Sequence, residues 1–312
     1  MRVFLAGGTG VIGRVLVPML VQDGHEVTGI TRSTQKLAAL EALGATPVLC
    51  DVYDAERLRE VVVAAQPVVV IQHLTDLPPD LNPRNLRKGY ARNDRVRSEG
   101  ASNLLAAAEA AGARRYLAQH VSFLCKPIGP RVLNEEAPLW TDAPDPYGAS
   151  IRLHEAMERR IVGAPNADGL VLRFGFWYGP GTSFASDGYT ARLVKRRLFP
   201  IVGDGGGMSQ FVHIEDVAEA TTAAMTRGAP GVYNITDDDP APMREWLPEY
   251  ANALGAPTPR RVPLWLARLV VGRFIAMQGT EMRGASNEKA KRELDWKPRY
   301  ASWRQGFREA LG

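Results

Sequence analysis

The chain contains only two cysteines, Cys50 and Cys125, and each ends an apolar run that resembles a strand. Two thiols placed in this way form neither a disulfide framework nor a zinc site. The sequence therefore predicts a reducing compartment. No charged or apolar leader precedes the first glycine turn, so we expect a cytoplasmic protein.

Long hydrophobic runs are also missing. No stretch reaches the roughly 18 uninterrupted apolar residues that span a bilayer. The most apolar late segment, Leu264 to Met277, is interrupted by Arg268 and Arg273. We expect this segment to pack on the core or to line a substrate pocket, and we expect no membrane partner.

No large region of the sequence concentrates charge of one sign. The formal net charge is +4, and 23% of the 312 residues are charged. A nucleic-acid partner would require a concentrated basic face, so none is indicated. The 45% hydrophobic content is that of a globular protein with a substantial core, in one large domain with an appendage or in two domains.

Short runs rich in Val, Ile and Leu alternate with helical patterns through the first half of the chain. This alternation predicts an α/β fold, a Rossmann-type doubly wound parallel sheet with helices on both faces. The expected strands are 3–6, 27–31, 46–49, 68–72, 116–120 and 169–174, and the expected helices are 13–22, 34–43, 55–65, 98–111 and 147–161.

The alternation fades after Trp177. We therefore expect a dinucleotide-binding domain at 1–175. Residues 176–312 should form mainly a smaller C-terminal substrate lobe, with about 208–235 returning to the Rossmann sheet. Such a lobe would cover the sheet edge at which doubly wound folds bind their ligands.

The first strand leads into Gly7-Gly8-Thr9-Gly10-Val11-Ile12-Gly13, and an amphipathic helix follows at once. Glycines at this spacing allow a tight turn, close approach of a pyrophosphate and close packing of helix on strand. The helix N-terminus offers N–H groups to the phosphates. Because the turn has the required strand before it and helix after it, we predict a nicotinamide dinucleotide site.

The end of the second strand bears on the choice of cofactor. Enzymes that prefer NAD usually carry an acidic residue there, whereas a basic residue accommodates the 2′-phosphate of NADP. This chain has Arg32 and no acid. NADP is favoured over NAD, and the alternative is that Arg32 is a solvated loop residue.

Several motifs together resemble those of the extended short-chain dehydrogenase/reductase group, the NAD(P)-dependent epimerase/dehydratase family. Besides the glycine turn they are Pro146-Tyr147-Gly148-Ala149-Ser150, Leu172-Arg173 leading to Tyr178-Gly179-Pro180-Gly181, Phe211-Val212-His213-Ile214-Glu215-Asp216-Val217-Ala218, Gly231-Val232-Tyr233-Asn234-Ile235 and Glu293-Leu294-Asp295-Trp296-Lys297-Pro298. The resemblance implies that Asp51 and Val52 contact the adenine. It also implies cofactor contacts at Leu74, Thr75 and Phe174, and a homodimer formed through helices 98–111 and 147–161.

The same resemblance implies a Tyr-x-x-x-Lys pair as the catalytic centre, in which the lysine holds the ribose and lowers the pKa of the tyrosine. Tyr147 matches the tyrosine, but the lysine position is Ile151. Ser122 is the hydroxyl that follows the fifth strand, and His120 is either an acid/base or a structural residue. An asparagine of the family's proton relay is replaced by Arg97.

The substrate positions differ as well. Ser209 stands where related sugar-nucleotide epimerases carry an arginine that binds the diphosphate, and Phe176 stands where they carry an asparagine. Aromatic residues gather in this region instead. They favour an apolar or aromatic substrate, bound by Phe176, Trp177, Tyr178 and Ser209, although Lys195 to Arg197 form either an acidic-group site or a solvated helix face.

Three hypotheses follow. The first is an NADP- or NAD-dependent oxidoreductase that reduces a carbonyl of a small metabolite, in secondary metabolism, with Tyr147 as proton donor and Ser122 or His120 polarising the oxygen. The second is an atypical enzyme that catalyses isomerisation, dehydration or cyclisation without net redox change. The third is a catalytically silent dinucleotide-binding regulator, which Ile151 favours.

Overall fold

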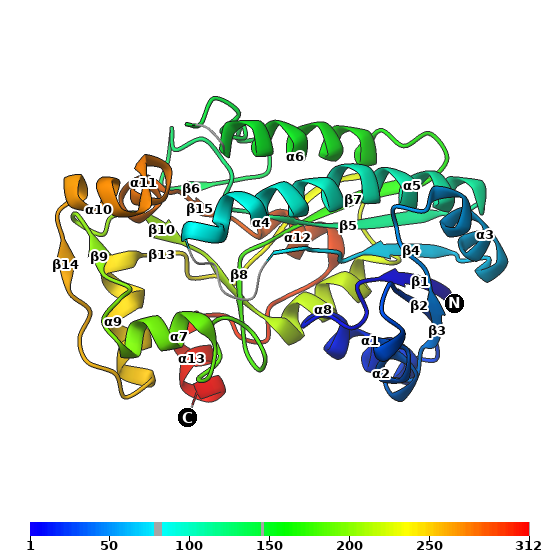
Figure 1. Ribbon diagram of the computed structural model, residues 1–312, viewed down its shortest axis with the longest axis horizontal. Coiled ribbons are helices and arrows are strands. Elements are labelled where there is room, and N and C mark those ends of the chain that lie inside the picture. The colour runs from blue at the N-terminus through cyan, green and yellow to red at the C-terminus, as the bar shows by residue number, and fades with distance from the viewer. Residues whose placement is uncertain (78–82, 145–146, 312) are drawn as a thin grey trace.

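The structure, a computed structural model, describes residues 1–77, 83–144 and 147–311. Pro146 lies outside the described residues. Within the described part, seven parallel strands form one sheet in the order β3-β2-β1-β4-β5-β7-β12 (Figure 1). These strands are β1 (Arg2–Ala6), β2 (Glu26–Thr31), β3 (Thr46–Leu49), β4 (Val69–Gln72), β5 (Arg115–Val121), β7 (Asp168–Phe174) and β12 (Gly231–Ile235). The order reverses between β1 and β4, which confirms the predicted doubly wound Rossmann fold.

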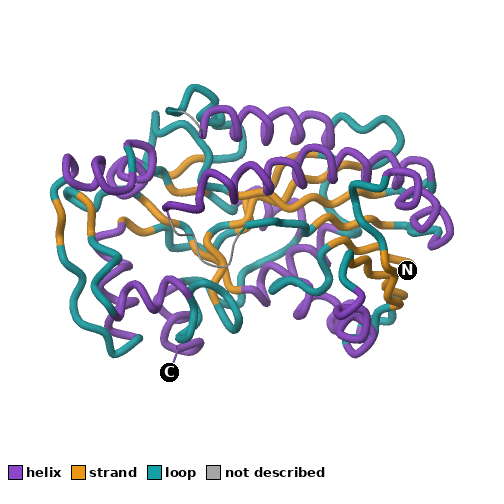
Figure 2. The backbone as a smooth tube through the Cα atoms, in the orientation of Figure 1, coloured by secondary structure: helices purple, strands orange, loops and turns teal. Residues whose placement is uncertain are grey.

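Helices cover both faces of this sheet, as Figure 2 shows. They are α1 (Gly13–Gln22), α2 (Leu37–Ala42) after the 3₁₀ turn η1 (Thr34–Lys36), α3 (Ala55–Ala65), α4 (Pro83–Arg95), α5 (Ala101–Ala110) after the π-helical turn η2 (Val96–Gly100), α6 (Tyr147–Val162), α8 (Ile214–Ala224) and α12 (Glu288–Leu294). Helices α1, α8 and α12 pack on one face, and α3, α5 and α6 on the other. Because both faces are covered, β1 is apolar at successive positions: Val3 and Leu5 enter one core, Phe4 and Ala6 the other.

The C-terminal lobe is built from short strands and five helices within the described residues. The strand pairs are β8 (Phe176–Tyr178) with β11 (Phe211–His213), β9 (Ile201–Val202) with β14 (Arg261–Val262), β10 (Met208–Ser209) with β13 (Ala241–Pro242), and β6 (Val132–Leu133) with β15 (Gly284–Ala285). The helices are α7 (Tyr189–Lys195), α9 (Met243–Ala253), α10 (Leu264–Val271), α11 (Arg273–Glu281) and α13 (Trp303–Leu311). An aromatic core that includes Phe211, Trp246 and Trp303 holds α9 and α13 together.

Part of the late chain belongs to the Rossmann domain. Strand β12 adds to the sheet edge beside β7, and α8 packs on α1. Two buried carboxylates hold the last segment of the chain in place. Asp216 accepts hydrogen bonds from the backbone N–H groups of Arg299 and Tyr300, at 2.7 and 3.2 Å. Asp237 accepts a hydrogen bond from the backbone N–H of Trp303 at 2.7 Å. The C-terminal lobe is thereby held against the sheet that carries the glycine turn.

Two expected helices differ from the structure. The helix expected to begin at residue 98 is preceded by α4, which was missed because its sequence is polar and arginine-rich with few apolar residues. The segment 264–277 is broken at Gly272, whose φ of 84° is a left-handed conformation that favours glycine. Its second half, α11, packs as expected, whereas α10 packs through one side, on Val202 and Ala276, and leaves Leu269 76% exposed.

The junction of α6 with β7 generates a stability prediction. A Cβ on Gly169 would overlap the carbonyl of Ile161, so Gly169→Ala should lower the free energy of unfolding by about 2–3 kcal/mol. Gly112→Ala is the control, because its φ is 69° but nothing lies within 4 Å of the added atom. Denaturant unfolding should show a loss of only about 1–2 kcal/mol there, from backbone strain. Equal losses in the two variants would refute the overlap.

Candidate active site

The glycine turn lies at the carboxyl end of β1, beside the point where the strand order reverses. A Cβ on Gly7 would lie 2.6 Å from the carbonyl oxygen of His73, and one on Gly13 would overlap the turn's own backbone. The turn is therefore as tight as the spacing predicted, and α1 begins at Gly13 with its N-terminus beside the cavity. Such a cradle suits a pyrophosphate.

A cavity extends from this turn across the ends of β2, β3 and β4. Of the residues expected to bind the cofactor, it is lined by Gly7, Thr9, Gly10, Arg32, Asp51, Val52, Leu74 and Thr75. Four others lie outside the lining: Val11, Ile12, Gly13 and Phe174. Ile12 and Phe174 are buried in the core behind the turn, where they support the cavity wall.

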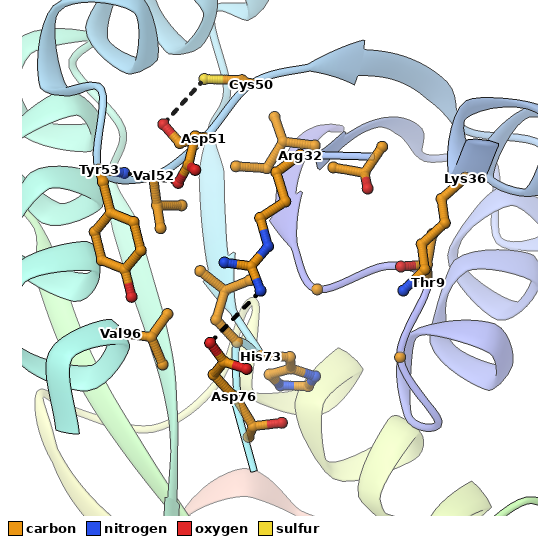
Figure 3. Close-up of a pocket in the computed structure, with 16 residues that line it drawn as sticks. Thr9, Arg32, Lys36, Cys50, Asp51, Val52, Tyr53, His73, Asp76 and Val96 are labelled. Atoms are coloured by element: carbon orange, nitrogen blue, oxygen red, sulfur yellow. Dashed lines mark hydrogen bonds and ion pairs between the residues drawn. The ribbon is translucent and has the colours of Figure 1, made fainter. Parts of the chain in front are cut away.

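The far end of the cavity is fixed by local hydrogen bonds. Asp51 Oδ1 accepts the N–H of Tyr53 at 3.1 Å, and the amide of Asn103 donates to the carbonyl of Val52 at 2.9 Å. Figure 3 shows Arg32 reaching into the space between Tyr53 and Lys36. Arg32 is 61% exposed and lies 3.5 Å from Asp76.

Sequence reasoning missed several residues of this cavity, among them Lys36, Tyr53, His73, Asp76 and Val96. His73 is the most informative. Its ring is buried, and neither ring nitrogen has a hydrogen-bond partner among the described residues. Burial, reinforced by Arg97, lowers the pKa of His73 to about 3, so the ring is neutral. Its position directly after an apolar strand was the signal that could have identified it.

The residues present therefore fit a dinucleotide. The turn leaves no room for side chains where phosphates approach, and an unpaired imidazole lines the cavity. Two cationic side chains, Arg32 and Lys36, also line the cavity. No cluster of metal-ligating side chains occurs among the described residues.

Tyr147 is the first residue of α6. Its ring stacks on Phe274 at a centroid distance of 4.0 Å and meets Tyr90 edge-on at 5.4 Å. Burial raises the pKa of the Tyr147 phenol above its ordinary value. One turn along α6, Ile151 is only 2% exposed and packs with Leu139, Ala143 and Phe274. A hydrocarbon thus stands where an ammonium group would assist the tyrosine.

A second, narrow cavity adjoins this pair. It is lined by Phe123, Leu124, Cys125, Pro127, Trp140, Ile151, Phe274, Met277, Gln278 and Met282. None of these described lining residues is charged. Because these residues come from segments far apart in the chain, no sequence pattern predicted that they line one cavity.

His120 turns away from both cavities toward α6. Its Nδ1 lies 2.9 Å from Glu158 Oε1, and the Nε of Arg173 donates to the same carboxylate at 2.7 Å. All three side chains are buried. Burial lowers the pKa of His120, so this imidazole is neutral near pH 7. The arrangement favours the structural alternative for His120.

The hydroxyl of Ser122 is likewise engaged. Its Oγ donates to the carbonyl of Phe174 at 3.2 Å and accepts the amide of Gln210 at 3.0 Å. The side chain is 2% exposed. Polarising a substrate oxygen would require Ser122 to give up its bond to Phe174.

The four expected substrate residues are not brought together. Phe176 stacks on Phe123, a residue of the narrow cavity, at 4.4 Å. Trp177 packs toward the Rossmann core, Tyr178 is buried in the aromatic core of the lobe, and Ser209 is buried in β10. Only Phe176 therefore adjoins the apolar cavity.

Comparison with known proteins identifies the family of the chain. The model of the NAD dependent epimerase/dehydratase family matches residues 3–236, and the protein belongs to that family. It is 42% identical to the 3-diazoavenalumate denitrifying reductase of a Streptomyces species, over 98% of this chain and 99% of that protein. A 4-hydroxy-2-methyl-3-oxo-4-farnesyl-3,4-dihydroquinoline-1-oxide ketoreductase of Stigmatella aurantiaca is 30% identical over 79% of this chain and 71% of that protein.

Solved structures agree on the fold. The chain is similar to UDP-glucose 4-epimerase of Thermotoga maritima, with a TM-score of 0.78, 20% identity and coverage of 100% of this chain and 97% of that one. A human epimerase family protein with NADPH gives a TM-score of 0.74 at 20% identity, covering 100% of this chain and 99% of that one. The protein is thus an enzyme of the oxidoreductase, epimerase and dehydratase type with a nicotinamide dinucleotide as cofactor.

The buried ion network yields a pH prediction. Burial alone would raise the pKa of Glu158, but hydrogen bonds from Arg173 and His120 hold it at about 2. Because the pKa is depressed on folding, the stabilisation is complete above the unfolded value of 4.5 and is lost as pH falls toward 2. Glu158→Gln should lower the free energy of unfolding by about 3 kcal/mol at neutral pH, and by much less as the pH approaches 2.

Chemical denaturation of both proteins across the acid range measures this difference. Glu155→Gln is the matched control, because Glu155 makes a surface pair with Arg159 on the same helix. A gap between wild type and Glu158→Gln that does not narrow with acid would contradict the assignment.

Proposed function

We propose that this enzyme is a reductase that transfers a hydride from a nicotinamide dinucleotide to a small aromatic substrate bound against the apolar residues of the narrow cavity beside Tyr147 and Ile151. The bound dinucleotide would supply the hydride. Trp140, Phe274 and the methionines would present an apolar wall to the substrate ring and keep water away from it. The uncharged lining is the observation that carries this proposal.

The polar groups around the cavity favour a reaction that needs no proton. Tyr147 has a raised pKa and no lysine beside it, so its phenol stays protonated near neutral pH and is a weak acid. His120 and Ser122 are engaged in bonds within the fold. A reduction completed by hydride alone suits this site better than one that must also protonate an oxygen.

Replacement of a diazonium group by hydrogen is such a reaction. The hydride forms the new C–H bond, the C–N bond breaks, and nitrogen leaves as N₂ with the dinucleotide oxidised. The charges balance without a proton. The name of the 42% identical Streptomyces relative describes a reductive denitrification, and this supports the same class of substrate for the present chain.

The electrostatics of the cavity fit a cationic arene. Aromatic faces such as those of Trp140 and Phe274 attract a cation within about 6 Å of the ring. An ammonium at position 151 would repel it, whereas Ile151 does not. The substitution that weakens acid/base catalysis therefore favours a diazonium substrate.

Carbonyl reduction is the second candidate. Its supporting observations are that Tyr147 stacks on Phe274, a residue of the cavity wall, and that the Stigmatella relative is named a ketoreductase. In this reaction Tyr147 would donate the proton, and Ser122 or His120 would polarise the oxygen. Both candidates use the same cofactor and cavity, so one assay separates them.

The direct test uses NADPH deuterated at its transferable hydrogen. With 3-diazoavenalumate, the substrate named for the relative, we expect N₂ release and deuterium at the ring carbon that carried the nitrogen, both measured by mass spectrometry. The same enzyme is offered aryl ketones and aldehydes. Turnover of carbonyls without turnover of diazo compounds would select the second candidate, and no oxidation of NADPH by either would reject both.

Substitutions at Tyr147 and Ile151 separate the candidates further. Tyr147→Phe should leave kcat/KM for a diazo substrate within about threefold, whereas loss of a proton donor costs about 10² to 10⁴. Ile151→Lys should slow diazo reduction by repulsion, and Ile151→Met controls for repacking. A large loss in Tyr147→Phe with the diazo substrate would contradict proton-free chemistry.

We further propose that NADPH is preferred over NADH. Support comes from two cationic side chains that line the cofactor cavity: Arg32, directly after β2, where the ribose 2′-phosphate would lie, and Lys36. The salt bridge from Arg32 to Asp76 is exposed and therefore weak enough to exchange for a phosphate.

The double variant Arg32→Ala/Lys36→Ala should lower kcat/KM for NADPH at least about tenfold and leave that for NADH nearly unchanged, because two charge-assisted contacts are lost only with the phosphate. Arg57→Ala is the control, since its exposed side chain pairs with Glu60 outside the cavity. Equal losses with both cofactors would argue against a 2′-phosphate contact.

We also retain a homodimer as a proposal. Ala149, Leu153 and Ala156 form an exposed apolar stripe along α6, at helical spacing. This stripe suits helix packing across a two-fold axis.

A further inference from the structure

Helix α10 presents large apolar side chains to solvent. Trp265 is 64% exposed, Leu266 38%, Leu269 76% and Val270 70%. Leu266, Leu269 and Val270 follow Trp265 by one, four and five residues, so all four side chains lie on one side of the helix. We call this side the α10 face. The opposite side, through Ala267, packs on Val202 and Ala276. Contiguous exposed apolar groups of this size mark an interaction surface.

The surroundings of the α10 face are basic. No Asp or Glu occurs between Glu249 and Glu281, whereas Arg260, Arg261, Arg268 and Arg273 occur there and are exposed. One acidic side chain does lie close to the helix: Asp204, on the turn that contacts the start of α10. The four arginine side chains make no ion pair with any residue in the described ranges. The partner of this face is therefore both apolar and anionic.

A second copy of the chain does not meet this description. In a two-fold dimer each α10 face would meet its own equivalent, and the arginines of both copies would be brought together. The face also lies at the end of the molecule farthest from β3, on the outside of the C-terminal lobe (Figures 1 and 2). A protruding apolar helix with a tryptophan and flanking arginines matches the chemistry of a membrane interface.

We propose that the α10 face docks on the surface of an anionic lipid bilayer, without crossing it. No helix within the described residues is long and apolar enough to span a membrane. Trp265, Leu266, Leu269 and Val270 enter the headgroup region, and the arginines bind lipid phosphates and carboxylates. Helix α11 follows directly after Gly272 and supplies Phe274 and Met277 to the narrow cavity. Docking therefore places the substrate cavity next to the lipid surface.

Co-sedimentation of the full chain with vesicles tests this docking. The vesicles are pure phosphatidylcholine or phosphatidylcholine with about one third phosphatidylserine. We expect binding to the anionic vesicles only, and a loss of binding at high salt because the attraction is screened. Trp265 fluorescence should shift to shorter wavelength on binding, and Trp265→Phe should abolish the shift while other tryptophans remain.

Two double variants separate the apolar and charged contributions. Leu269→Ala/Val270→Ala and Arg268→Gln/Arg273→Gln should each weaken vesicle binding about tenfold or more. The matched controls are Leu49→Ala/Val63→Ala and Arg59→Gln/Arg114→Gln, which remove exposed groups of the same kind elsewhere. Thermal unfolding of all four should match that of wild type.

Absence of wild-type binding to anionic vesicles would overturn the proposal, as would equal binding by the α10 variants and their controls. Sedimentation velocity gives an independent check. If wild type self-associates and Leu269→Ala/Val270→Ala does not, the face is a protein interface and the lipid assignment is wrong.

Discussion

The packing of Ile151 against Phe274 and Leu139 is the constraint on which the proposed chemistry depends. It places a hydrocarbon one helical turn from Tyr147, at the point where the family's resemblance implies a lysine. A lysine would contribute a charge that holds the phenol in a reactive protonation state. Leu139, Ala143 and Phe274 pack on Ile151 and form an apolar wall instead. In our proposal the dinucleotide would supply hydride at a site where proton transfer is weak.

The other acid/base groups near the site serve the fold. Glu158 binds His120 and Arg173 together in a buried network between β5, β7 and α6. Breaking such a network is costly, since it leaves a buried charge without its partner. His120 is therefore held by Glu158, and polarising a substrate oxygen would require it to give up that bond.

Local and periodic features were readable from the sequence. The parallel strands and the glycine turn follow from short-range patterns, Arg32 follows from its position after the second strand, and Asp51 follows from the family resemblance. The narrow cavity was not readable, because Trp140, Phe274 and Met282 meet only through tertiary packing. Helix α4 has few apolar residues, and it packs against η2 and α6. The outward side of α10 was also missed, because an apolar run gives no sign of which side packs.

The central claim is that reduction at this site is completed by hydride without a proton. The most direct measurement compares kcat/KM for a diazo substrate and NADPH in H₂O and in D₂O, with analysis of the new C–H bond. The account predicts equal rates in the two solvents and no solvent deuterium at the ring carbon. A clear solvent isotope effect, or deuterium taken from D₂O into that bond, would contradict it.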